Sequence, residues 1–171
     1  MNDAKRMHAM SRHCGRGYRA RWLTLGLLTA SFWTAGLPGN EATAALVDFR
    51  VVADGIPEPL VAAPGNAARG RALVVARESA NCILCHSFTD PALRFSGTIG
   101  PALDGVGRRL SVAQLRLRVV DYQHVNANVV MPSYYRVNGQ NRIAEPYRDQ
   151  PVLDAQQIED IVAWLATLTA P

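Results

Sequence analysis

The sequence predicts a small all-α domain whose helices are joined by long loops. Helical periodicity is clear near residues 67–79, 111–120 and 154–168, and the last two segments begin with strong capping signals. Convincing β-strand alternation and internal repeats are absent from the sequence. The loops at 87–109 and 121–151 are rich in Gly, Pro and Asn. Loops this long are unusual without a function, so we expect them to surround a cofactor.

The first predicted helix starts after Asn66, which is a favourable N-cap residue, and runs from Ala67 to Ser79. One face of this helix holds Gly70, Leu73, Val74 and Arg77. Glycine inside a helix costs about 1 kcal/mol relative to alanine. Gly70 therefore favours a close approach of another backbone, with simple tolerance on an exposed face as the alternative.

The other two helices have clearer start signals. Ser111 and Gln114 form a capping box, and Asp154 and Gln157 form a second one. The apolar face of the middle helix is predicted to hold Val112, Leu115 and Val119. The apolar stripe of the last helix is predicted to hold Ile158, Ile161, Val162, Leu165 and Leu168.

The N-terminal part of the chain reads as a targeting segment. Residues 1–44 carry six basic and two acidic residues, which accounts for the whole net charge of +4. The rest of the chain is therefore formally neutral and gives no support for nucleic-acid binding. The apolar run 23–33 and the small residues up to Ala44 predict a signal peptide at 1–44 and a periplasmic mature protein. The run is short for a membrane span, which needs about 20 apolar residues; an uncleaved anchor is the alternative. Residues 45–65, which contain three prolines, are predicted to form an irregular extension before the domain at 66–171.

Two cysteines carry the main chemical signal. Cys14 is expected to leave with the signal peptide, and the segment from Cys82 to His86 reads C-x-x-C-H, the haem attachment motif. Two thiols at this spacing can add to the two vinyl groups of one porphyrin, and the adjacent imidazole can reach the iron from the same side. We therefore expect one covalently bound haem c, held by Cys82 and Cys85 and ligated by His86.

Other uses of these cysteines fit less well. A zinc site needs two further ligands, and the mature chain offers only His124 outside the motif. A thioredoxin-like pair needs a βαβ context, which the sequence does not predict. A plain disulfide leaves the adjacent His86 unexplained.

Met131 is the predicted second axial ligand. It is the one methionine after residue 44, and Pro132 stiffens its loop. A thioether ligand raises the haem potential and suits electron transfer. Met131 as a core filler and His124 as a bis-histidine ligand are the alternatives.

Three further residues are candidates for the surroundings of the haem. The Pro101 carbonyl is placed to accept a hydrogen bond from Nδ1 of His86, which fixes the ring of a ligand; an ordinary Gly-Pro turn is the alternative. Arg108 and Arg109 are candidate partners of the haem propionates, because guanidinium groups pair well with carboxylates. Solvated arginines are the alternative.

The stretch from Asn66 to Leu168 resembles class I cytochromes c. It has C-x-x-C-H after a first helix, a Gly-Pro-x-Leu, a late Met-Pro and an aromatic residue in the last helix. The resemblance implies the class I cytochrome c fold around one haem, ligated by His86 and Met131. It also implies that Gly70 and Trp164 meet where the first and last helices cross, with Trp164 among the haem-binding residues.

Within this class the chain most resembles the SoxX family. The matching segments are 100–107 (GPALDGVG), 115–121 (LRLRVVD), 131–137 (MPSYYRV) and 157–165 (QIEDIVAWL). Family members often carry Gly-Lys before the proline of the last loop. Here Asp149-Gln150-Pro151 stands instead, and no lysine follows residue 44, which argues against lysine-mediated docking.

The resemblance implies a role in sulfur oxidation. SoxX is the monohaem subunit of SoxAX, which oxidatively couples thiosulfate to a cysteine of the SoxYZ carrier. The bond-forming site is expected in a SoxA partner, so this chain is expected to accept electrons and pass them to a downstream acceptor, with SoxYZ a transient partner. A stand-alone periplasmic electron shuttle is the alternative, and a haem-based ligand sensor with an open sixth position is a third reading.

Overall fold

The computed structural model describes residues 46–93, 95–139 and 141–170. The predicted signal peptide at 1–44, its cleavage site and Cys14 lie outside these residues. The described parts contain four α-helices: α1 (Ala67–Val75), α2 (Val106–Arg109), α3 (Val112–Asp121) and α4 (Ala155–Thr167). Short 3-10 helices form at Cys82–Leu84, Pro91–Leu93, Tyr122–His124 and Glu145–Tyr147. These parts contain no strand beyond one isolated bridge between Val52 and Gly55, as an all-α fold requires.

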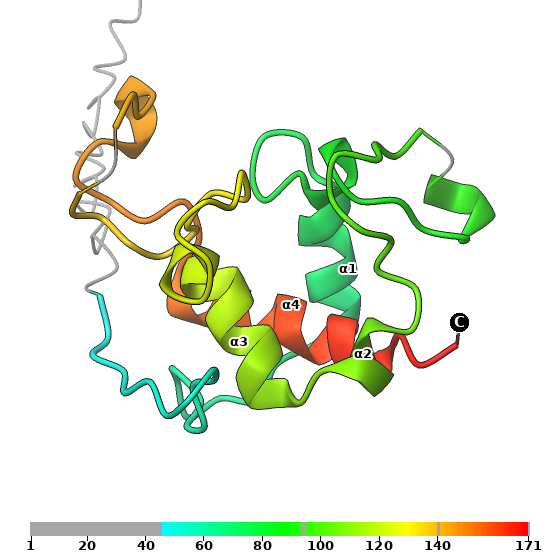
Figure 1. The fold of residues 1–171 in the computed structure, drawn as a ribbon, viewed down its shortest axis with the longest axis horizontal. Coiled ribbons are helices and arrows are strands. Elements are labelled where there is room, and N and C mark those ends of the chain that lie inside the picture. Colours follow the sequence, from blue (N-terminus) through cyan, green and yellow to red (C-terminus); the bar gives the residue numbers. More distant parts are fainter. Residues whose placement is uncertain (1–45, 94, 140, 171) are drawn as a thin grey trace, which may run out of the picture. The chain divides into compact units, whose positions relative to one another are not determined.

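Helix α4 is the centre of the fold. It contacts α1, α2 and α3, and Figure 1 shows it lying between α1 and α3. Its apolar stripe supplies the fully buried Ile158 together with Ile161 and Val162. None of the described helices is long and apolar enough to cross a membrane.

The predicted caps explain where the helices begin. Asn66 accepts a hydrogen bond from the Arg69 amide at 3.0 Å, and complete capping boxes start α3 at Ser111 and α4 at Asp154. These interactions satisfy amide groups that have no partner inside the first turn of a helix.

Gly70 lies where α1 crosses α4. A Cβ on this glycine would fall 1.9 Å from the carbonyl oxygen of Asp160, so the two backbones touch. The predicted close approach is therefore confirmed, and it occurs one helical turn before Trp164.

The structure corrects three details of the prediction. Helix α1 ends at Val75 rather than Ser79, because Ala76 adopts an extended conformation with ψ of 118°. Val112 does not lie on the buried face of α3, since it is 48% exposed; Arg116, Leu117 and Val120 are buried beside Leu115 and Val119. The predicted loop at 87–109 contains the short helix α2.

The extension at 46–65 packs onto the helices. Ile56 is fully buried, and its amide donates to the Ala113 carbonyl at 2.9 Å. The buried Arg116 donates to the Ile56 carbonyl at 2.6 Å and forms two hydrogen bonds with the carboxylate of Glu159, which also accepts from the Leu60 amide. This buried ion pair therefore joins the extension, α3 and α4.

Candidate haem site

The C-x-x-C-H segment forms one tight turn. Asn81 has left-handed backbone angles (φ 45°, ψ 41°) and starts the 3-10 helix at Cys82–Leu84. The amides of Cys85 and His86 both donate to the Cys82 carbonyl, at 3.1 and 3.0 Å. The turn places both thiols and the imidazole in the lining of one cavity. The two thiols are free rather than joined in a disulfide.

The ring of His86 is held in one orientation. Its Nδ1 lies 2.7 Å from the Pro101 carbonyl, which is the predicted hydrogen bond. A carbonyl can only accept, so Nδ1 is the donor, and Nε2 is the ring nitrogen left to bind a metal ion. Gly100 lies against the ring, because a Cβ there would be 2.5 Å from Cε1 of His86. Any side chain at position 100 would displace the imidazole.

The cavity has a volume of about 540 Å³ and mainly apolar walls. Part of its wall is formed by apolar side chains of α2, α3 and α4 and by one residue two positions before α4: Val106, Leu115, Val119, Ile161, Leu165 and Leu153. This size is usual for small-molecule and cofactor sites. The cavity therefore suits a large, mostly apolar ligand.

Met131 lines the same cavity as His86, although the two residues are distant in the sequence. Its loop is fixed from both sides: the Ser133 hydroxyl donates to the Val120 carbonyl at 2.8 Å, and the Tyr134 hydroxyl donates to the Ala80 carbonyl at 2.8 Å. Ala80 lies two residues before Cys82, so Tyr134 links the Met131 loop to the cysteine turn. The cavity is thus enclosed between a segment with two thiols and an imidazole and a segment with a thioether.

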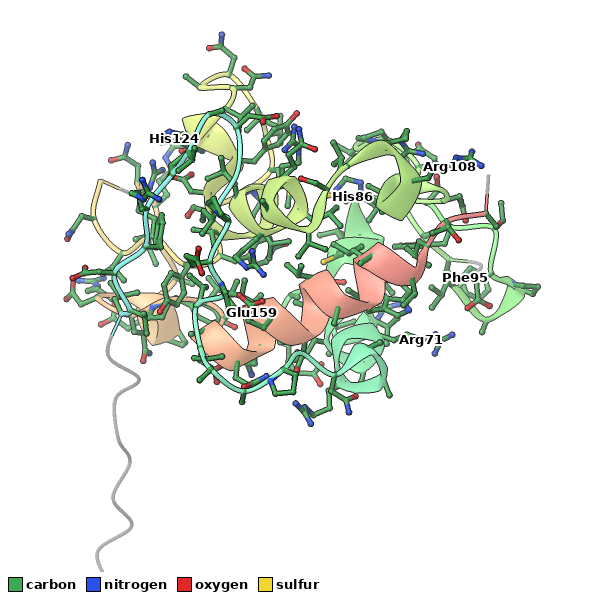
Figure 2. All side chains as sticks on the ribbon, turned by 90° about the horizontal axis from the view of Figure 1, so that it is seen from below. Arg71, His86, Phe95, Arg108, His124 and Glu159 are labelled. Carbon is green, nitrogen blue, oxygen red and sulfur yellow. The ribbon has the colours of Figure 1, made fainter. Side chains whose placement is uncertain are left out.

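His124 does not belong to this site. It is exposed in the 3-10 helix at Tyr122–His124 and does not line the cavity. Figure 2 shows it well away from His86. The bis-histidine alternative therefore has no support from the geometry.

The arginines differ from the prediction. Both predicted arginines are exposed, but only Arg109 lines the cavity, where it donates to the carbonyls of Ala102 and Asp104. Arg108 does not line the cavity. Arg118 on α3, which no sequence motif singles out, is the second arginine of the lining. From sequence alone, an arginine on an amphipathic helix is expected to point into solvent. Only the folded structure shows that Arg118 lines the cavity.

Trp164 also lies outside the cavity lining. It is only 7% exposed, and its ring packs against Phe88 with the ring centroids 5.5 Å apart. The structure therefore makes Trp164 a core residue next to the cysteine turn.

Burial sets the protonation of two groups at the site. Burial raises the pKa of the Cys82 thiol to about 11 and also raises the pKa of Tyr134. A thiol with such a pKa is protonated at neutral pH, unlike the thiolates of redox-active or metal-binding cysteines. In addition, no group of three or more metal-binding side chains occurs in the described part of the chain, which disfavours the zinc alternative.

The residues present fit a haem. Two thiols and an oriented imidazole face the cavity from one segment, and a thioether lines it from another. The walls are apolar, as a porphyrin needs, and the two charged side chains, Arg109 and Arg118, suit the two carboxylates that a haem carries.

Comparisons with known proteins agree with this geometry. The family model for cytochrome c matches residues 67–169, which implies a covalently bound haem c. A chain in the crystal structure of SoxXA from P. pantotrophus is 36% identical, with a TM-score of 0.66; the alignment covers 71% of this chain and 94% of that chain. A comparison with curated protein sequences finds no match. The chain therefore belongs to the cytochrome c family, and within that family it is a SoxX-type cytochrome.

Proposed function

We propose that this chain is a periplasmic monohaem cytochrome that accepts and relays electrons as the SoxX subunit of a SoxAX complex. That complex would oxidatively couple thiosulfate to a cysteine of a SoxYZ carrier. The observation that carries the proposal is the convergence of Cys82, Cys85, His86 and Met131 on one apolar cavity, in a chain similar to SoxXA. A bound haem supplies a one-electron redox centre.

The residues of the chain would share the work of holding that centre. Cys82 and Cys85 would form the two thioethers, and Nε2 of His86 would bind the iron while Pro101 fixes the ring. Met131 would fill the sixth position, where a thioether raises the reduction potential. The apolar side chains of α2, α3 and α4 would exclude water.

The described residues would keep no free cysteine as the nucleophile that thiosulfate coupling requires. Cys82 and Cys85 are the only cysteines in the described residues, and haem attachment would consume both. We therefore place the bond-forming site in the SoxA-type partner, and this chain removes the electrons that the coupling releases.

The mouth of the cavity offers an apolar docking surface for that partner. Ile99 and Val130 line the cavity and are 72% and 80% exposed, and the 63% exposed Leu84 lies in the cysteine turn. Exposed apolar side chains grouped at a cavity mouth are typical of interaction sites. No lysine follows residue 44, so the partner would bind through these apolar side chains rather than through lysines.

Co-expression with a SoxA-type cytochrome tests this role. We expect a stable heterodimer on size exclusion, and we expect the double variant Ile99→Asp with Val130→Asp to abolish it. Val112→Asp is the matched control, because Val112 is an exposed apolar residue outside the cavity lining. A haem-loaded chain that stays monomeric beside the partner would instead favour a stand-alone electron shuttle.

Carbon monoxide binding distinguishes a haem-based ligand sensor from both the SoxX subunit and the stand-alone shuttle. With Met131 at the sixth position, the reduced native protein should not bind carbon monoxide. Rapid binding without denaturation would show an open iron and support the sensor.

A further inference from the structure

Arg118 is a cation fixed at the wall of the proposed haem cavity. Its side chain lines the cavity and is 19% exposed. NH1 donates to the Gln114 carbonyl at 3.0 Å, and the guanidinium carbon lies 5.5 Å from the centre of the Tyr122 ring. Gln114 lies one turn before Arg118 in α3, and Tyr122 directly follows this helix. The guanidinium is therefore held in place by its own helix.

The partner of this cation comes from the extension. A carboxylate oxygen of Asp54 lies 3.5 Å from NH2 of Arg118, and the Asp54 carbonyl accepts from NH1 at 3.5 Å. Gln114 donates a hydrogen bond to the same carboxylate at 2.8 Å. The hydrogen bond from Gln114 lowers the pKa of Asp54, and the charge of Arg118 lowers it further. Together they outweigh desolvation, which would raise this pKa. Asp54 is therefore ionised at neutral pH.

The position of Asp54 depends on how the extension is anchored. Two residues later, the fully buried Ile56 hydrogen-bonds to Ala113 of α3 through its amide and accepts from Arg116 through its carbonyl. The extension is thus fixed to the same helix that carries Arg118.

Arg118 and Arg109 are the only arginines in the cavity lining, and no carboxylate of the described residues lines it. Arg109 donates to the carbonyls of Ala102 and Asp104, and its charge helps to lower the pKa of the Asp104 carboxyl, which belongs to the same loop. Arg118 instead faces the ionised Asp54, which belongs to the extension. The net charge near the cavity therefore depends on whether the extension is in place.

We propose that Arg118 and Asp54 form a charge pair through which the N-terminal extension sets the reduction potential of the haem cavity. The proposal rests on the proposed function, because it assumes a haem bound at this site. Reduction lowers the positive charge of the cavity by one. A nearby cation therefore favours the reduced form and raises the potential, whereas a nearby carboxylate favours the oxidised form and lowers it.

Potentiometric titration of the mature, haem-loaded protein at low ionic strength tests the pair, because salt screens partly exposed charges. Asp54→Asn should raise the potential and Arg118→Gln should lower it. We expect each variant to change the one-electron equilibrium constant two- to tenfold, or roughly 20–60 mV at 59 mV per tenfold change.

Two controls separate charge from structure. Arg118→Lys keeps the charge and should restore most of the native potential. Asp48→Asn removes the same charge from an exposed position on the same extension. The ion pair of Arg118 is with Asp54 and not with Asp48, so this variant should leave the potential unchanged. Hydrogen exchange at the Ile56 amide should be the same in the native protein and in Asp54→Asn, which shows that the extension stays in place.

The outcome is decided by the signs of the shifts. Opposite shifts for Asp54→Asn and Arg118→Gln support the pair. Shifts in the same direction, or none in either variant, overturn it even when the protein carries its haem. A native protein without a haem spectrum would overturn the proposed function instead, so the two failures are distinguishable.

Discussion

At the scale of single residues, Arg116 and Glu159 show how a polar group can organise this core. Both side chains are almost fully buried, and their two hydrogen bonds measure 2.7 and 2.9 Å. The pair also holds the Ile56 carbonyl and the Leu60 amide, so it satisfies the backbone of a segment that lacks regular structure. Buried polar groups of the backbone need such partners.

We predict that Glu159→Gln destabilises the protein by about 3–5 kcal/mol, because it leaves the charge of Arg116 buried without its partner. Urea unfolding of the haem-loaded protein measures the loss. Glu145→Gln is the matched control, since the Glu145–Arg148 ion pair is exposed and should contribute little. Equal effects of the two variants would refute an organising role for the buried pair.

We predict that Met131→Ala lowers the reduction potential and opens the iron to external ligands. The reason is that Met131 is the one thioether in the cavity lining. Optical spectra of the reduced protein with carbon monoxide check both effects, and His124→Ala serves as a control because His124 is exposed outside the cavity. An unchanged spectrum in Met131→Ala would exclude Met131 as a ligand.

The sequence was sufficient to predict some of these residues and not others. Cys82, Cys85 and His86 lie within five residues of one another, so their chemistry follows from spacing. Met131 is a candidate because no other methionine follows residue 44. Arg118 and Arg116 could not be assigned in this way. Their roles depend on Asp54, Ile56 and Glu159, which only the folded extension and α4 bring close.

At the scale of elements, the crossing of α1 and α4 depends on the absence of a side chain at Gly70. We predict that Gly70→Ala destabilises the protein by about 1–3 kcal/mol, since the new methyl group would overlap the Asp160 carbonyl. Thermal unfolding measures this effect. Ala68→Ser, on an exposed position of the same helix, should change stability far less. If Gly70→Ala left the stability unchanged or raised it, close contact between α1 and α4 at Gly70 would not contribute to stability.

The same crossing gives a pH dependence. Burial would raise the pKa of Asp160, but hydrogen bonds from Arg69, the Asn66 amide and Gln156 outweigh it and lower the pKa below the usual 3.8. A lowered pKa contributes stability that is present above pH 3.8 and is lost as the pH falls through the folded pKa. We therefore predict that Asp160→Asn is less stable at pH 7 and loses less stability than the native protein on acidification. Parallel stability–pH curves would contradict this.

Helix starts were predictable because capping is local, whereas helix ends were less so. Asn66, Ser111 and Asp154 all cap the helices that their sequence context indicates. The end of α1 depends on the chain turning toward Asn81 and the cysteine turn, and no residue of the predicted helix forbids its continuation. Tertiary structure decided that boundary.

At the scale of the whole molecule, a small set of helices holds a cavity of about 540 Å³. A short helix such as α1, with nine residues, is not stable in water alone. We predict that the double variant Cys82→Ala with Cys85→Ala is poorly folded, because binding of a ligand by the folded state offsets the cost of ordering the loops. Circular dichroism and protease resistance check this; a stable, protease-resistant double variant would contradict it.

The extension at 46–65 belongs to this larger scale as well. Its prolines and lack of periodicity predict irregular structure, and that structure is indeed irregular. Its contacts with α3 and α4 were not predictable, because they pair single residues such as Ile56 and Leu60 with distant parts of the chain.

The most direct test of the central claim is the mass of the protein, produced in a host that attaches haem c. We predict an intact mass that exceeds the polypeptide by one haem, a Soret band, and a haem-modified peptide that contains Cys82 and Cys85. A protein with the mass of the bare polypeptide and no Soret band would contradict the claim that these two cysteines hold a haem.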